Sequence, residues 1–244
     1  MFEGFPDEAF AFLRHLAAEQ NKPWFEANKG VYDDAVRWPL TALIADLTSE
    51  FTRLGIPLQG DPRRSVFRIH RDVRFARDKA PYKTNAGAVL TGDGGMGSPG
   101  LLYIHIQPGR CFTACGFYRP DIEPLQLIRD TTVARPQAYR KLLRTLSDRG
   151  LHLAVDEDAL KRTPRGFDSV TDADLADAVR RRSFIVREEL ARQEVASAAL
   201  VRRLTDFAQR ALPLLSFGWK ALGVDHAPPR GLPVSPTITK GGPA

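Results

Sequence analysis

The stretch LLYIHIQPGRCFTACGFY, residues 101–118, decides the expected fold because its side chains alternate with a period of two. Alternation of this kind is typical of a β-strand with one buried face and one exposed face. One face of the predicted strand carries the apolar residues Leu102, Ile104 and Ile106. The other face carries Tyr103, His105 and Gln107. A proline and a glycine at 108 and 109 separate the two halves, which predicts an antiparallel hairpin.

Neighbouring segments extend this hairpin into a small antiparallel meander. NAGAVL, residues 85–90, precedes it across the glycine-dense loop TGDGGMGSPG, residues 91–100, and SFIVREEL, residues 183–190, is a further candidate strand. Upstream, FRIHRDVRF, residues 67–75, also alternates, with apolar side chains at 67, 69, 73 and 75 and charged or polar ones at 68, 70, 72 and 74. We therefore expect this segment to be a strand as well.

Helical patterns lie on both sides of the predicted sheet. Before it they occupy residues 5–20, 23–38 and 39–55, with an interruption near Gly30 and a stop at Gly55. After it they occupy residues 121–135, 136–150, 171–182 and 197–222, and Pro213 is expected to end or kink the last helix. The order of these elements predicts an α+β fold, in which helices from the N-terminal and C-terminal parts cover one face of an antiparallel sheet. The uncovered face is where we expect a site.

The composition fits one globular domain. The chain has 244 residues, of which 43% are hydrophobic and 26% charged, enough for a sizeable core. We expect this domain to span residues 1–226, and we expect the Pro- and Gly-rich residues 227–244 to be a disordered tail.

Cys111 and Cys115 lie too far apart along one strand for a disulfide and are expected to be core thiols.

No run approaches the roughly 18 apolar residues of a membrane helix. The opening MFEGFPDEAF carries acidic groups where a secretory signal is basic, so the sequence predicts a cytoplasmic protein without a membrane partner. The net charge of +6 favours acidic partners over basic ones.

Positive charge is concentrated between residues 63 and 83. This segment holds eight Lys or Arg and two Asp, so its net charge of 8 − 2 = +6 equals that of the whole chain. If residues 67–75 form a strand, Arg68, His70, Asp72 and Arg74 share one face at roughly 6.6 Å intervals. Guanidinium groups so arranged repel one another unless an anion lies between them, and Asp72 neutralises them only in part.

The following stretch, ARDKAPYKTN, breaks the alternation and is expected to form a loop beside the arginine face. It would deliver Lys79, Tyr82 and Lys83, which suit a phosphate or a carboxylate. Arg71 is an exception to the alternation, because it falls on the same predicted face as the apolar residues 67, 69, 73 and 75. Either Arg71 is paired internally or the strand has a bulge there.

The stretch RIHRDVRFARDKAPY resembles the motif R-x-x-R-D-x-R-F-x-x-[DN]-K-x-x-Y of a conserved bacterial and fungal family, domain of unknown function 2461. The matching positions are Arg68, Arg71, Asp72, Arg74, Phe75, Asp78, Lys79 and Tyr82. The likeness continues through GFP near the start, WFEANKGVYDDAV, GFYRPD and TPRGFD, to about Leu222. The resemblance implies that the polar cluster distinguishes the family, and it assigns no activity, substrate or cofactor.

The favoured hypothesis is a pocket that binds a small phosphorylated or carboxylated ligand, with any enzymatic activity left open. The predicted ligand-binding residues are Arg68, Arg71, Asp72, Arg74, Asp78, Lys79, Tyr82, Lys83, Arg119 and Arg165. His70 and Asp72 are the catalytic candidates, with His70 as a general base oriented by Asp72. No cofactor is expected, and no metal, because the guanidinium groups would repel a cation.

Two alternatives remain. In one, the basic strand contacts the phosphates of a nucleic acid, while Tyr82 or Phe75 stacks on a base. In the other, the motif is an internal ion-pair network without a ligand, which pairs Arg71 with Asp72. The oligomeric state is left open.

Overall fold

The sheet is antiparallel throughout and has the strand order β1-β2-β3-β4. A computed structural model describes residues 1–74 and 77–226 of the chain. The strands are β1 (Ala86–Thr91), β2 (Leu101–Ile106), β3 (Phe112–Phe117) and β4 (Phe184–Glu189). Leu90 lies opposite Leu102, and Leu102 lies opposite Cys115, so apolar side chains cross the sheet on one face. The predicted meander and its fourth strand are confirmed.

Helices from both ends of the chain complete the fold. Those before the sheet are α1 (Asp7–Ala18), α2 (Lys22–Ala27), α3 (Lys29–Val31), the π-helix η1 (Tyr32–Arg37) and α4 (Trp38–Leu54). Those after β3 are α5 (Ile122–Ala134), α6 (Pro136–Asp148), α7 (Ala173–Arg180), α8 (Arg192–Val195) and α9 (Ala199–Ala221). Gly55 ends α4 in the left-handed conformation, φ 66°, as the sequence predicted. The α+β prediction is confirmed.

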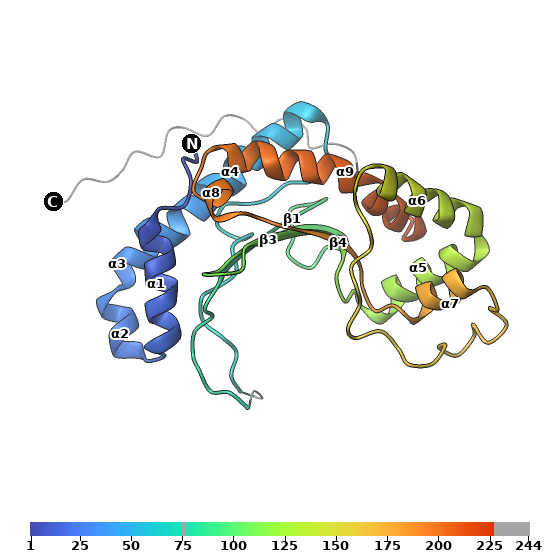
Figure 1. Cartoon of the computed structure of the whole chain (residues 1–244), viewed down its shortest axis with the longest axis horizontal. Helices are drawn as coiled ribbons and strands as arrows, with labels where there is room; N and C mark the ends of the chain where they lie inside the picture. Colours follow the sequence, from blue (N-terminus) through green and yellow to red (C-terminus); the bar gives the residue numbers. More distant parts are fainter. Residues whose placement is uncertain (75–76, 227–244) are drawn as a thin grey trace.

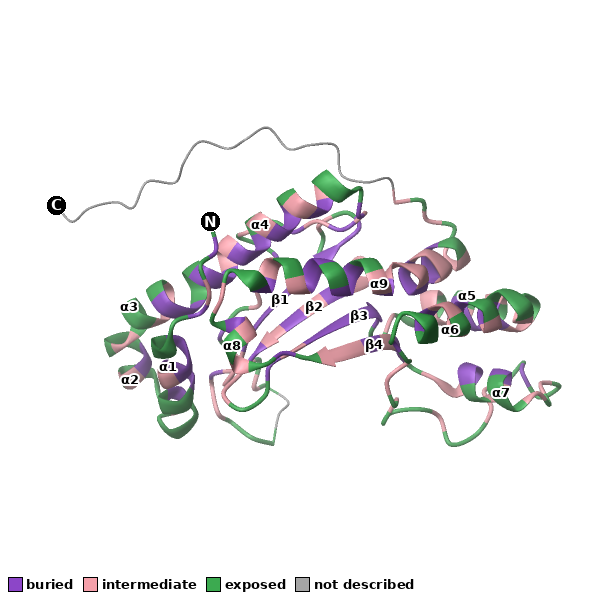
Figure 2. Cartoon of the chain, turned by 45° about the horizontal axis from the view of Figure 1, so that its top comes forward, coloured by how far each residue is buried: buried purple, intermediate pink, exposed green. Residues whose placement is uncertain are grey.

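The core lies between the sheet and two long helices. Helices α4 and α9 contact the sheet and lie on the same side of it (Figures 1 and 2). Leu102, Ile104 and Ile106 of β2 are fully buried beneath them. Tyr103 and His105, on the other face, are only half-buried, so one face of the sheet is less covered than the other.

Of the two outcomes that the sequence predicts at Pro213, an end or a kink of the last helix, the structure rules out the end. Helix α9 runs on to Ala221, and the residues that follow the proline include the buried Leu214, Leu215 and Trp219. An interior proline costs a helix roughly 3 kcal/mol. Burying these three large side chains, each worth about 1.5–3 kcal/mol, more than offsets that cost.

The strand predicted over residues 67–75 does not form in its described part, residues 67–74, and this prediction was wrong. Phe67 N–H donates to Gly87 O at 2.9 Å, so the chain follows the edge of β1 up to this point. The chain then leaves the sheet, and residues 69–71 pair with residues 81–83. Arg71 N–H donates to Pro81 O at 2.8 Å, and Lys83 N–H donates to Ile69 O at 2.7 Å. Pro81 has no N–H to donate, which limits this pairing to an isolated bridge. We call residues 69–83 the arm.

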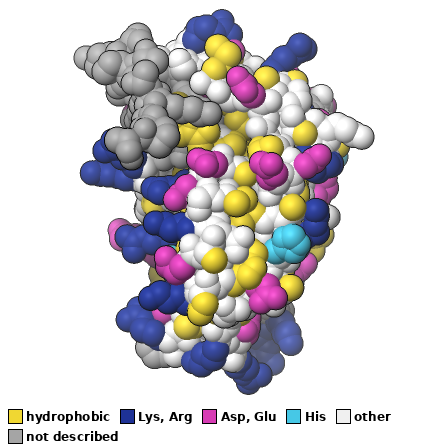
Figure 3. All heavy atoms as spheres, turned by 90° about the vertical axis from the view of Figure 1, so that its left-hand side faces the viewer, with side chains coloured by type: hydrophobic (Ala, Val, Ile, Leu, Met, Phe, Trp, Pro, Cys, Tyr) yellow, Lys and Arg dark blue, Asp and Glu magenta, His cyan; other side chains and the backbone are white. Residues whose placement is uncertain are grey.

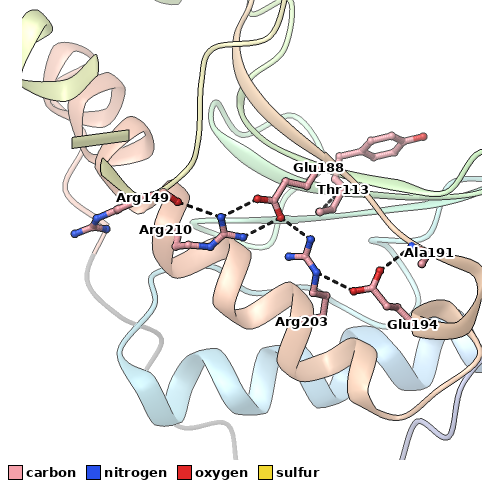
Figure 4. Close-up of polar contacts among 8 residues, drawn as sticks. Thr113, Arg149, Glu188, Ala191, Glu194, Arg203 and Arg210 are labelled. Atoms are coloured by element: carbon pink, nitrogen blue, oxygen red, sulfur yellow. Dashed lines mark hydrogen bonds and ion pairs between the residues drawn. The ribbon is translucent and has the colours of Figure 1, made fainter. Parts of the chain in front are cut away.

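A cluster of charged residues fixes β4 to the helices (Figure 4). The Glu188 carboxylate accepts hydrogen bonds from Arg210 at 2.7 and 2.8 Å and contacts Arg203 at 2.6 Å. Arg203 also donates to Glu194 of α8 at 3.0 Å. Because both arginines belong to α9, this cluster joins the sheet edge to two helices.

The other sequence predictions have mixed outcomes. Cys111 and Cys115 are buried free thiols, as expected, and burial raises the pKa of both. No helix within residues 1–74 and 77–226 is long and apolar enough to cross a membrane. The predicted tail, residues 227–244, lies outside the described residues.

Candidate functional site

The base of the arm is held against the N-terminal helices. Gln20, just beyond α1, accepts a hydrogen bond from the backbone N–H of Tyr82 at 3.0 Å. The Tyr82 ring is 3% exposed and stacks on Phe25 of α2, with ring centroids 4.5 Å apart. The His70 ring lies 5.2 Å from that of Tyr82. Tyr82 is therefore a packing anchor, and the base of the arm has a defined position.

The tip of the arm is closed by its own charges. Arg71 pairs with Asp78 at 2.6 Å, and Arg74 pairs with Asp72 at 2.7 Å. Lys79 Nζ donates to the carbonyl of residue 73 at 3.0 Å. The hydrogen bonds from Arg71 and Arg74 lower the pKa of Asp78 and Asp72 respectively, so both carboxylates are held in the ionised form.

This arrangement corrects two expectations. The internal partner of Arg71 is Asp78 rather than Asp72. Asp72 is engaged by Arg74, and within the described part of the chain no hydrogen bond joins Asp72 to His70. The contacts of His70 are with the rings of Phe25 and Tyr82. Asp72 therefore does not orient His70 as a base.

We expect a double-mutant cycle to separate these pairings. Arg71→Met and Asp78→Asn should show a non-zero coupling free energy in urea unfolding, because each change removes the same ion pair. The matched cycle of Arg71→Met with Asp72→Asn should show no coupling within error. Coupling to Asp72 and none to Asp78 would contradict the observed pairing.

An open hollow of about 760 Å³ lies beside the arm, and we call it the basic hollow. Its charged and titratable lining residues are Arg63, Arg64, Arg68, His70, Asp72 and Lys83. Val66, Phe67 and Met96 add an apolar lining. Across residues 1–74 and 77–226, the side chains of the three arginines form no ion pair with a carboxylate. Four cations thus surround the hollow with one carboxylate, and Arg74 already pairs with that carboxylate.

Lys83 lines both the basic hollow and a second one. Its Nζ is 5.1 Å from the centroid of the Phe67 ring, a cation–π contact. Partial burial lowers the pKa of this lysine, because the charged form loses part of its hydration. The second space, which we call the polar hollow, is open and measures about 330 Å³. It is lined by Gln20, Arg71, Asp78, Lys83, Thr84 and Asn85, together with Tyr82 and two alanines.

Residues 8–217 match the model of the family described as Conserved hypothetical protein (DUF2461). The chain belongs to this family. No match was found among curated proteins or among solved structures. The description of the family names no activity, so the chemistry of this DUF2461 protein has to be argued from its own side chains.

In this DUF2461 chain the predicted site residues are divided among several places. Arg68, Asp72 and Lys83 line the basic hollow, and Arg71, Asp78, Tyr82 and Lys83 line the polar hollow. Arg74 and Lys79 close the tip and line neither. Figure 3 views the molecule from the side of α1–α3 and shows Lys and Arg side chains gathered toward the lower end, where the arm lies in Figure 1.

Arg119 and Arg165 do not line either hollow, so the expectation that they share the pocket is not met. Arg119 forms an ion pair with Asp158, and its backbone N–H donates to Ser183 Oγ at 3.1 Å. Its φ of 40° places it in the left-handed region at the turn before α5. Arg165 is exposed in the segment that precedes α7.

Some residues of the basic hollow are not among the predicted site residues. Arg63 and Arg64 belong to the basic segment, but the alternation of residues 67–75 does not include them. Their backbone N–H groups donate to Asp61 Oδ1 at 2.7 and 3.0 Å, a turn that the Asp-Pro pair at 61 and 62 could have indicated. Met96 comes from the glycine-rich loop, and nothing local in the sequence places it there. Among the residues that the structure describes, no group of three His, Cys, Asp or Glu is arranged to hold a metal ion.

Proposed function

We propose that the protein binds a small anionic ligand in the basic hollow. The observation that carries this proposal is the difference between two sets of arginines. Arg71 and Arg74 have carboxylate partners in the arm, whereas Arg63, Arg64 and Arg68 surround a hollow and pair with no carboxylate of the described chain. Neighbouring guanidinium groups repel one another, and an anion between them removes that repulsion.

The rest of the lining suggests what else the ligand carries. Phe67, Val66 and Met96 provide apolar contacts beside the cations, and the volume of about 760 Å³ lies within the usual range for small-molecule sites. Lys83 adds a fourth cation, and its partial burial strengthens its attraction to an anion. We infer a phosphate or carboxylate group attached to a larger body.

The internal pairs support a second role for part of the motif. Arg71, Asp78, Asp72, Arg74 and Lys79 are engaged with one another or with backbone carbonyls. We infer that these five residues shape the arm, and that the arm in turn presents Arg68 and Lys83. This separates a structural group within the motif from the residues that contact the ligand.

Replacing Arg68 tests the proposal. We expect inorganic phosphate, titrated at constant ionic strength, to raise the melting temperature of the wild-type protein in a saturable way. Arg68→Gln should weaken phosphate affinity by about 10- to 100-fold, because a charge-assisted hydrogen bond contributes about 1.5–3 kcal/mol. The variant should melt normally without phosphate, since Arg68 is exposed.

Arg144→Gln is the matched control, because Arg144 is exposed on α6 and lines neither hollow. An equal phosphate response in both variants would contradict the proposal. A single-stranded oligonucleotide provides the other comparison. If it binds with a steep dependence on salt while phosphate does not saturate, the basic hollow serves nucleic acid instead.

A further inference from the structure

The polar hollow differs in chemistry from the basic hollow beside it. Its carboxylate, Asp78, is already paired with Arg71, and the rest of its polar lining includes the uncharged side chains of Gln20, Thr84 and Asn85. Besides that ion pair the polar hollow has one cation, Lys83, whereas four cations line the basic hollow, so it attracts a phosphate less strongly. A hydroxyl group both donates and accepts, and therefore suits a lining that mixes a carboxylate, amides and a hydroxyl.

We propose that the polar hollow recognises the hydroxyl groups of a sugar, so that the ligand is a sugar phosphate whose phosphate occupies the basic hollow. This inference rests on the proposed function and names its ligand class. Lys83 lines both hollows. In this proposal one molecule reaches across Lys83, with its phosphate among the arginines and its hydroxylated part against Thr84 and Asn85.

The sheet fixes the two side chains that would contact the sugar. Gln107 Nε2 donates to Thr84 Oγ1 at 3.4 Å, which leaves the Gln107 carbonyl oxygen facing His105 Nε2 at 2.9 Å. That oxygen can only accept, so His105 carries its proton on Nε2 and Nδ1 is the acceptor. Tyr103 then donates its O–H to His105 Nδ1 at 2.9 Å.

This hydrogen-bonded chain determines which groups remain for a ligand. Asn85 Nδ2 faces His105 Nδ1 at 3.4 Å, beside the shorter hydrogen bond that Tyr103 donates to the same nitrogen, and this orientation leaves the Asn85 carbonyl oxygen to accept from a sugar hydroxyl. Thr84 accepts from Gln107, so its own O–H remains to donate. The wall thus offers one acceptor and one donor side by side, which is the complement of a hydroxyl.

His105 is held neutral and in one orientation, which keeps this pattern fixed. Its ring stacks on Phe112, with centroids 4.5 Å apart and planes 19° apart. Burial, aided by the charges of Arg110 and Arg187, lowers the pKa of His105 despite the opposing effects of Gln107 and Glu189. A neutral imidazole retains the lone pair on Nδ1 that accepts the Tyr103 O–H.

The test compares two probes on the same protein by calorimetric titration at constant ionic strength. We expect ribose 5-phosphate to bind the wild-type chain about tenfold or more tightly than inorganic phosphate, since each added hydrogen bond contributes about 3- to 10-fold. Asn85→Ala should remove most of this gain and leave the affinity for inorganic phosphate unchanged. Thr84→Val should act in the same way, whereas Thr84→Ser, which keeps the hydroxyl, should retain the gain.

Pentyl phosphate is the matched ligand, because it has five carbons and no hydroxyl groups. It should show no dependence on Asn85 or Thr84. If ribose 5-phosphate binds no tighter than inorganic phosphate, or if Asn85→Ala and Thr84→Val weaken both probes equally, the sugar inference is wrong while anion binding stands. If inorganic phosphate shows no binding that depends on Arg68, the proposed function itself fails.

Discussion

Gly116→Ala is expected to destabilise the protein by more than about 4 kcal/mol, a large fraction of the roughly 5–15 kcal/mol that stabilises a typical domain. Gly116 lies in β3 opposite Ile185 of β4, with a φ of 131° that L side chains rarely adopt. A Cβ atom there would lie 2.1 Å from the carbonyl oxygen of Phe184 and 2.9 Å from the side chain of Leu214. Because the nearest obstacle is backbone of the neighbouring strand, relief requires the β3–β4 pairing to open.

Gly30→Ala is the matched control. A Cβ at Gly30, in the short helix α3, meets nothing within 4 Å, and its φ is not in the left-handed region. Alanine is the better helix former by about 1 kcal/mol, so this variant should be as stable as the wild type or slightly more so. Urea unfolding followed by circular dichroism measures both. A Gly116→Ala protein with wild-type stability would show that the sheet accommodates a side chain at this position.

The sheet could be predicted from sequence because its signals are local. Residues 101–118 hold both strands of a hairpin, and only the short turn after Ile106 separates them. The same alternation in residues 67–75 gave a wrong prediction, because a strand also needs a partner that can complete the ladder. The return segment contains Pro81, and the contact that holds it comes from Gln20, some sixty residues away.

The grouping of the site residues could be predicted only in part, for a related reason. An extended backbone keeps its alternation of side chains even without a ladder, and Arg68, His70 and Asp72 do lie around one hollow. The alternation of side chains cannot show how the tip of the arm folds. Arg71 finds Asp78 seven residues later, which removes it from the set of arginines that pair with no carboxylate. Met96 reaches the hollow from a separate loop.

This division changes how the family motif is interpreted. A dense set of fixed charges suggests one pocket, yet several of its members are engaged in shaping the arm. The arginines that line the basic hollow are Arg68 from the motif and Arg63 and Arg64 from the turn before it. Substitutions at the tip are therefore expected to act through the position of the arm, and substitutions at Arg68 through direct contact.

Glu188→Gln is expected to cost about 2–4 kcal/mol at neutral pH, the second large effect. The Glu188 side chain is 19% exposed and accepts hydrogen bonds from Arg210 while it contacts Arg203. Glutamine keeps a single acceptor and loses the charge, which takes away the carboxylate that Arg210 pairs with and leaves Arg203 with Glu194 alone (Figure 4). Asp206→Asn on the same helix is the control, because Asp206 and Arg202 form a long, exposed pair of 3.9 Å. It should change stability by no more than about 0.5 kcal/mol.

The pH dependence of this loss tests its electrostatic origin. Burial alone would raise the pKa of Glu188, but the hydrogen bonds and charges of Arg210 and Arg203 outweigh burial and lower it below its ordinary value of 4.5. A carboxyl whose pKa is lower in the folded state contributes stability above its unfolded pKa and loses that contribution as the pH falls through the folded value. The wild type therefore loses stability below about pH 4.5, whereas the glutamine variant has no proton to gain at this position. The difference between the two free energies of unfolding should accordingly shrink as the pH falls below about 4.5 in urea titrations. A difference that stays constant from pH 7 to pH 3 would mean that Glu188 acts through packing alone.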